Sequence, residues 1–199
     1  MLPYGNSVRT IGPGDKIDHV TLLSIRVREG AWNVSRWFAP ICERGLQATE
    51  ARLLKMAQSR DPAQYPEFRG YGFENIAFVE YMCFFTIILD APGYSFHDGK
   101  DTDPIWFVEK KENSSLPPPP APVAPNRSFY DLEMTDIGGY PALRCRNYMC
   151  NGYTGEPLKE GEEQGFIFNL YIRGRYEHGG DSGVVLAIDP DGVSKGPRK

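Results

Sequence analysis

The sequence has no long apolar run. No stretch reaches the roughly 18 consecutive apolar residues that a membrane-spanning helix needs, so none is predicted. The first residues, Met1–Asn6, also lack the charged and apolar segments of a secretory signal peptide. We therefore expect a soluble, cytoplasmic protein that does not bind membranes.

Positive charge is scarce and dispersed. The chain has 22 Lys and Arg against 26 Asp and Glu, and its formal net charge is −4. No basic run is longer than a pair such as Lys110 and Lys111. Proteins that bind duplex nucleic acid carry basic patches or stripes. The composition therefore argues against nucleic acid duplexes, and we expect a protein partner or self-association instead.

Cysteine is also rare. The four cysteines are Cys42, Cys83, Cys145 and Cys150. They are scattered, and three of them have apolar or aromatic neighbours, a setting in which free cysteine behaves as a small hydrophobic residue. We expect reduced thiols. In an oxidising compartment, a bridge between Cys145 and Cys150 is the first alternative.

The residues that are abundant favour β-structure. The chain has 11 Tyr, 11 Phe, 21 Gly and 17 Pro, which is typical of strands joined by many turns. Apolar and polar residues alternate from His19 to Phe38, which predicts a hairpin. One helix is predicted over about Leu46 to Ser59, with Leu53 and its apolar neighbours inside and Glu50 on the polar face. The predicted fold class is mainly β (α+β).

A proline-rich segment divides the chain. Residues 116–125 read LPPPPAPVAP, which favours a stiff polyproline spacer. On each side the sequence shows a strand, an acidic Gly-rich turn and a second strand, over 82–108 and over 166–188. We therefore predict two β-rich lobes of antiparallel strands, 1–115 with the packed helix and 126–199 without one.

One segment resembles a catalytic motif. Gly180-Asp181-Ser182-Gly183 matches the centre of the serine protease signature, in which the serine is the nucleophile. The sequence around it does not continue that signature, so a tight hairpin turn is the preferred interpretation. The alternative is a small hydrolase or nucleotide-acting enzyme that uses Ser182 with His178 and Asp181, or a cysteine with a nearby histidine, such as Cys150 with His178.

Two acidic turns could bind a metal ion, one with Asp181, Asp189 and Asp191 and one that we keep as the candidate. Asp98, Asp101 and Asp103 could present oxygen ligands to Ca²⁺ from one short loop. The loop lacks the closing Glu of an EF-hand, and the three histidines are not spaced as adjacent zinc ligands. Solvated turn residues explain the pattern better, so we predict no cofactor and keep calcium as the alternative.

Tyrosine and arginine alternate on the strands of the second half. Such a composition is typical of protein interfaces and of stacking surfaces. Phe166 and Phe168 lie at period 2 with Leu170 and Ile172, which predicts a buried face opposite the one that carries Tyr171. The predicted binding surface comprises Tyr148, Arg146, Tyr171, Arg173 and Arg175. We therefore predict a non-catalytic binding or self-association module.

The sequence of the terminal hairpin resembles that of other proteins. Residues 165–172, GFIFNLYI, followed by residues 185–191, VLAIDPD, make the C-terminal third resemble short bacterial proteins of unknown role, some of which are labelled nucleotide synthetases. The resemblance implies a bacterial source. It implies no catalytic residue, because these proteins bring no established one.

Overall fold

The computed structural model describes residues 17–28, 31–59, 77–79, 82–97, 104–109, 128–148, 150–151, 154–159, 161–174, 184–188 and 191–195. It contains strands and one helix in the order β1 (His19–Arg28), β2 (Ala31–Pro40), α1 (Leu46–Gln58), β3 (Ala77–Val79), β4 (Cys83–Asp90), β5 (Tyr94–Phe96), β6 (Ile105–Glu109), β7 (Phe129–Ile137), β8 (Tyr140–Asn147), β9 (Glu163–Gly174), β10 (Val184–Ile188) and β11 (Asp191–Lys195). The predicted fold class, β-rich with one packed helix, is confirmed.

Five strands form sheet A in the order β2-β1-β4-β8-β7. β1 and β2 are the predicted hairpin, and they pair from His19 and Pro40 to Arg28 and Ala31. β4 lies at the centre of the sheet, a position that suits its continuous apolar sequence, and pairs with β1 in parallel. β7 and β8 are joined by Gly138 and Gly139, whose φ angles of 63° and 87° suit the tight turn of a hairpin.

The second sheet, sheet B, is built around the long strand β9. β10 and β11 pair one after the other along β9 in antiparallel orientation, and β3 adds to β11 in parallel. β5 and β6 also pair with β9, again antiparallel. One twelve-residue strand thus joins segments from the middle of the chain and from its C-terminal part.

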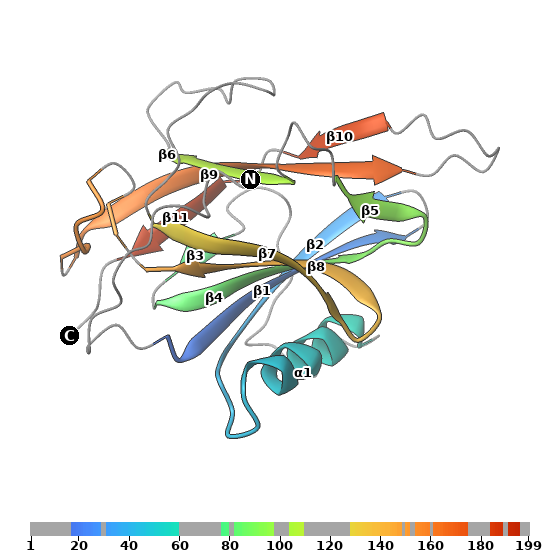
Figure 1. Cartoon of the computed structure of the whole chain (residues 1–199), viewed down its shortest axis with the longest axis horizontal. Coiled ribbons are helices and arrows are strands. Elements are labelled where there is room, and N and C mark those ends of the chain that lie inside the picture. Colours follow the sequence, from blue (N-terminus) through green and yellow to red (C-terminus); the bar gives the residue numbers. More distant parts are fainter. Residues whose placement is uncertain are drawn as a thin grey trace.

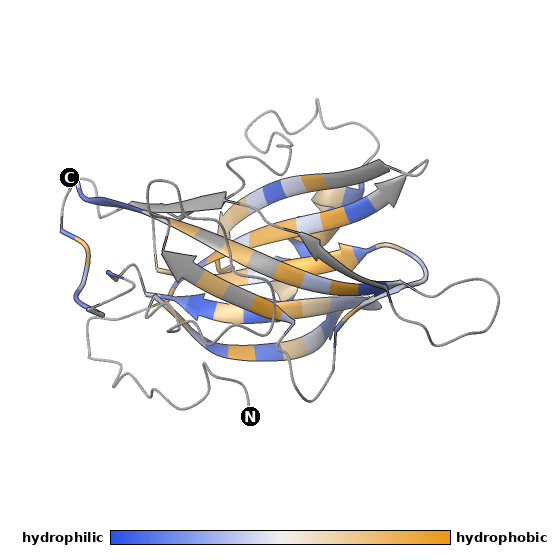
Figure 2. Cartoon of the chain, turned by 90° about the horizontal axis from the view of Figure 1, so that it is seen from above, coloured by the Kyte–Doolittle hydropathy of each residue, from blue (hydrophilic) through white to orange (hydrophobic). Residues whose placement is uncertain are grey.

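The two sheets and the helix form three layers, with sheet A between sheet B and α1 (Figure 1). Apolar and polar residues alternate along many strands (Figure 2), whereas β4, in the middle layer, is buried on both faces. Between the sheets, Phe85, Phe107 and Phe168 form the centre of the larger core. The Phe85 ring contacts the other two at centroid distances of 5.9 Å each. The predicted inner face of β9 is confirmed, because Phe166, Phe168, Leu170 and Ile172 all belong to this core.

Helix α1 covers the opposite face of sheet A. Leu53, Leu54 and Ala57 pack there with Trp37 and Ile88. The helix begins after Gly45, whose φ of 90° lies in the left-handed region that favours glycine. It ends at Gln58, within one residue of the predicted end.

The predicted division into two lobes is wrong. Sheet A combines β1, β2 and β4 with β7 and β8, and sheet B combines β3, β5 and β6 with the last three strands. Strands from both sides of the proline-rich segment therefore share both sheets and one core. Residues 116–125 themselves lie outside the described residues.

The two similar segments also have different structures. The second forms the predicted hairpin, because β9 pairs with β10. In the first, β4 lies in sheet A and β6 lies in sheet B, so the two strands do not pair. Hydrophobic strands resemble one another in sequence whichever partner they take.

Candidate functional site

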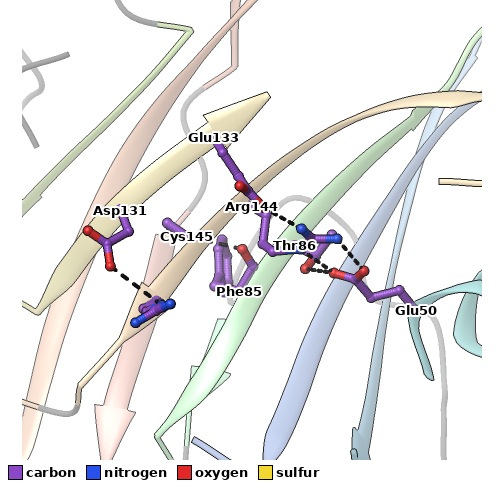
Figure 3. Close-up of polar contacts among 8 residues, drawn as sticks. Glu50, Phe85, Thr86, Asp131, Glu133, Arg144 and Cys145 are labelled. Atoms are coloured by element: carbon purple, nitrogen blue, oxygen red, sulfur yellow. Dashed lines mark hydrogen bonds and ion pairs between the residues drawn. The ribbon is translucent and has the colours of Figure 1, made fainter. Parts of the chain in front are cut away.

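A polar cluster lies between α1 and sheet A. Glu50 comes from α1, Arg144 from β8 and Thr86 from β4, and the three side chains point toward one another (Figure 3). Arg144 donates from Nε to Glu50 Oε1 at 2.8 Å and from Nη2 to Glu50 Oε2 at 2.5 Å. The Thr86 hydroxyl donates to Glu50 Oε1 at 2.8 Å. Glu50 is 0% exposed, so this is a buried, bidentate ion pair.

A second carboxylate extends the cluster to the surface. Arg144 also donates from Nη1 to Glu133 on β7, whose side chain is 53% exposed. The hydrogen bond with Glu50 is the main reason why the pKa of the Arg144 guanidinium is raised above its usual value. Arg144 therefore stays charged, with a carboxylate on each side.

The expected position of Glu50 is wrong. The sequence analysis placed it on the polar face of the helix, yet it lies on the buried face. Its spacing carried the signal: Leu53, Leu54 and Ala57 follow it at i+3, i+4 and i+7, which is the pattern of one helix face. Glutamate is almost never fully buried without a partner, and that partner lies 94 positions away.

The geometry of this cluster indicates that it fixes α1 to sheet A. The Glu50 carboxylate accepts three hydrogen bonds, from a guanidinium that donates two and a hydroxyl that donates one. A carboxylate held in this way is poorly suited to accept a proton from a substrate, and the helix covers it. Arg26 acts in the same way at the other end of α1, donating to Asp90 Oδ2 and to the Ala57 carbonyl oxygen, both at 2.8 Å.

The predicted Tyr/Arg surface is wrong in its two tyrosines. Tyr148 is 2% exposed and Tyr171 is 0% exposed, so neither offers a face for stacking. Tyr148 packs edge-on against Tyr130, at a centroid distance of 5.4 Å, in a small core with Cys150. Tyr171 points away from the main core but is buried nonetheless. The alternating pattern of β9 did not reveal the burial of Tyr171 on its second face.

The predicted arginines are only partly exposed. The Arg146 side chain is 34% exposed, forms an ion pair with Asp131 at 3.4 Å and lies over the Phe84 ring. A hydrogen bond with Tyr148 is the main reason why the pKa of Arg146 is raised. Arg173 donates from Nε to His97 Nδ1 at 2.9 Å. Arg175 lies outside the described residues.

The catalytic and metal candidates are not placed. Ser182, His178 and Asp181, like Asp98, Asp101 and Asp103, lie outside the described residues. Within the described ranges, no group of three or more His, Cys, Asp or Glu side chains could hold a metal ion. In the same part of the chain, no helix is long and apolar enough to cross a membrane.

The four cysteines are all free thiols. Burial in the core raises the pKa of Cys83 to about 12, and burial also raises that of Cys145. Cys42, in the loop before α1, is different. A hydrogen bond with the Thr49 hydroxyl, at 3.3 Å, is the main reason why its pKa is lowered.

Among the described strands, β7 and β2 form the two edges of sheet A, and they differ in the features that prevent pairing with another chain. β7 has a register shift between Tyr130 and Glu133, and Asp131 there has a φ of 53°, which is uncommon outside glycine. Asp131, Glu133 and Asp136 are all exposed on it. Bulges and charges on an edge strand prevent pairing with another chain.

β2, which forms the opposite edge among the described strands, has fewer of these features. It pairs with β1 without a register shift and carries one charged residue, Arg36. It is also held on both faces, because Val34 lies in the core between the sheets while Trp37 and Ala39 pack under α1. β2 is therefore a long, regular and rigid edge strand, the type that natural proteins usually protect.

Comparison of the chain with family models, with curated proteins and with solved structures found no match. The resemblance of the C-terminal third to short bacterial proteins stays a prediction.

Proposed function

We propose that the protein is a non-catalytic binding or self-association module that contacts its partner through the surface around Arg146. The observation that supports it is the Arg146 side chain, which is 34% exposed and lies over the Phe84 ring. Arginine is enriched at protein interfaces, and a guanidinium that lies over an aromatic ring is held in place for a partner. The proposal thus keeps Arg146 of the predicted surface and leaves out its two buried tyrosines.

The same proposal covers the cellular compartment, the kind of partner and the cofactor. Four free thiols fit the reducing conditions of the cytoplasm. The partner is a protein, since the chain carries a net charge of −4 and no basic cluster. The proposal includes no cofactor.

Substitution of Arg146 in the full chain tests this function. Arg146→Ala removes the guanidinium from the surface and should weaken the association that light scattering measures across a concentration series. Lys55→Ala is the control, because Lys55 is exposed on α1, away from this surface. Equal association of both variants and the wild type would refute a contact through Arg146.

The enzyme hypothesis has its own test. If 180–183 is a turn, Ser182→Ala should change the free energy of unfolding by less than about 0.5 kcal/mol and remove no activity. Hydrolysis of ester or nucleotide probes by the native chain, lost in Ser182→Ala at unchanged stability, would overturn the non-catalytic function.

A further inference from the structure

The surface around Arg146 carries both signs of charge. The carboxylate of Asp131 on β7 lies 3.4 Å from Arg146 Nε, and the Asp131 side chain is the more exposed of the two. The dashed line at Asp131 in Figure 3 marks this ion pair. Its length exceeds the roughly 3.2 Å of a normal N–H···O hydrogen bond, so the contact is weak. Both groups therefore keep hydrogen-bonding capacity that a partner can use.

The backbone of β7 is distorted where it brings Asp131 to this surface. Successive residues of a regular strand point to opposite faces, and Tyr130 is the residue that pairs with Arg146. Asp131, the next residue, would then point away, but the register shift that follows Tyr130 re-aims it. Its φ of 53° costs free energy in a residue with a side chain, and strain of this kind is frequent at binding sites. The weak ion pair within the chain offsets little of that cost, whereas a bond to a partner would offset more.

Arg146 is ordered before any partner binds. Its guanidinium lies over the Phe84 ring, at 5.6 Å from the ring centroid, and forms a hydrogen bond with Tyr148. A side chain that is already ordered loses little conformational entropy when a partner binds. Arg146 thus offers an ordered donor beside the acceptor of Asp131.

This arrangement of charges narrows the identity of the partner. A partner with only basic groups would place a like charge against Arg146, and one with only acidic groups would place a like charge against Asp131. The partner therefore needs an acceptor and a donor in the reverse order. A second copy of this chain supplies them, because a two-fold axis brings the same surface of each copy to the other. The net charge of −4 opposes association only weakly, since salt screens charges that lie more than about 8 Å apart.

We propose that the partner is a second copy of this chain, bound about a two-fold axis so that Arg146 of each copy donates to Asp131 of the other. This inference rests on the proposed function and names its partner. Charges then alternate in sign around the axis, and each carboxylate lies between the guanidinium of its own chain and that of the second copy. Because both copies use the same surface, the assembly closes at two copies.

Charge reversal in the full chain tests the inference. Light scattering across a concentration series should show the mass of the wild type rising from one chain to two. Arg146→Asp and Asp131→Arg should each weaken dimerisation by about tenfold or more, because each variant presents a single sign of charge to its own copy. An equimolar mixture of the two variants should recover dimerisation to within about threefold of the wild type, since each variant then meets the opposite charges.

Two further variants complete the test. Lys55→Asp reverses an exposed charge on α1 and should change dimerisation by less than about twofold. Asp131→Asn removes the charge but keeps a side chain that tolerates a positive φ, and it should weaken dimerisation by about threefold or more. Circular dichroism shows whether each variant is folded. If Asp131→Arg does not fold, Asp131→Asn decides the question, and an unchanged dimer in that variant would refute the proposed pair.

The outcomes separate the two proposals. A wild type that is monomeric at all concentrations would refute the second copy and leave Arg146 open to another protein. A dimer that Arg146→Asp weakens, but that the mixture with Asp131→Arg does not restore, would refute the reciprocal pairs and keep the contact through Arg146. A dimer that neither reversal weakens would refute both proposals.

Discussion

The face of sheet A that packs on sheet B differs from the face that packs on α1 in how it accommodates charge. Toward sheet B, phenylalanine rings meet, with Phe107 and Phe129 stacked at a centroid distance of 3.8 Å. Toward α1, the fully buried carboxylate of Glu50 meets the guanidinium of Arg144. The same strands supply both faces, since β4 directs Phe85 to one side and Thr86 to the other.

The difference follows from the side chains that sheet B and α1 each present to sheet A. Sheet B presents the apolar face of β9, so a charge there would lose its hydration without compensation. Helix α1 brings a carboxylate of its own, which pairs with the arginine of β8. A buried charge is tolerated where the opposite element supplies its partner.

Removing a ring from the apolar face should have the largest effect. Phe168→Ala creates a cavity among Phe85, Phe107 and Phe166 and should destabilise the fold by about 3–5 kcal/mol, measured by urea denaturation. Met134→Ala on β7 is the control, because this side chain is 51% exposed and should contribute less than about 0.5 kcal/mol. Equal losses in the two variants would refute the assignment of the core.

Breaking the ion pair on the other face should cost somewhat less. Glu50→Gln leaves Arg144 charged and partly buried, and we expect a loss of about 3 kcal/mol, at the lower end for a buried pair because Glu133 still binds the arginine. The same urea denaturation measures it.

The triple variant Glu50→Leu, Thr86→Val and Arg144→Met sharpens this test. Replacing both charges and the buried Thr86 hydroxyl with apolar groups should bring stability back to within about 1 kcal/mol of the wild type, because neither an uncompensated charge nor an unpaired hydroxyl remains. If Glu50→Gln costs under about 1 kcal/mol, the pair does not anchor the helix, and the contrast between the faces is smaller than the geometry implies.

The thiols on the apolar face should affect stability only in alkali. The pKa of Cys83 is about 12 in the folded chain, against about 8.5 for a free thiol. Its contribution to stability is therefore fully present below about pH 8.5 and is lost as the pH rises through about 12, at about 1.4 kcal/mol per pH unit. Urea denaturation at pH 8 to 11 should show a shallower decline for Cys83→Ala than for the wild type.

Cys42 is the matched control for the thiols. Its pKa is lowered, so iodoacetamide should alkylate it first in the folded chain at neutral pH. Rapid alkylation of Cys83 or Cys145 in the native protein would show that the apolar face does admit a thiolate.

The sequence by itself determined the elements whose signals are local. Alternation in 19–38 identified the hairpin of β1 and β2, and the period-2 face of β9 identified Phe166, Phe168, Leu170 and Ile172 as core. The predicted range of α1, about Leu46 to Ser59, followed from the spacing of its apolar residues. These features depend on the geometry of one strand or one helix, which a few neighbouring residues fix.

Only the tertiary structure decided which elements meet. β5 and β6 pair with β9, on the far side of the proline-rich segment, and this joins the two predicted lobes into one core. The same long-range packing buried Glu50, Tyr148 and Tyr171, which the local pattern left exposed. Periodicity tells which residues share a face, but whether that face is covered depends on segments far away in the sequence.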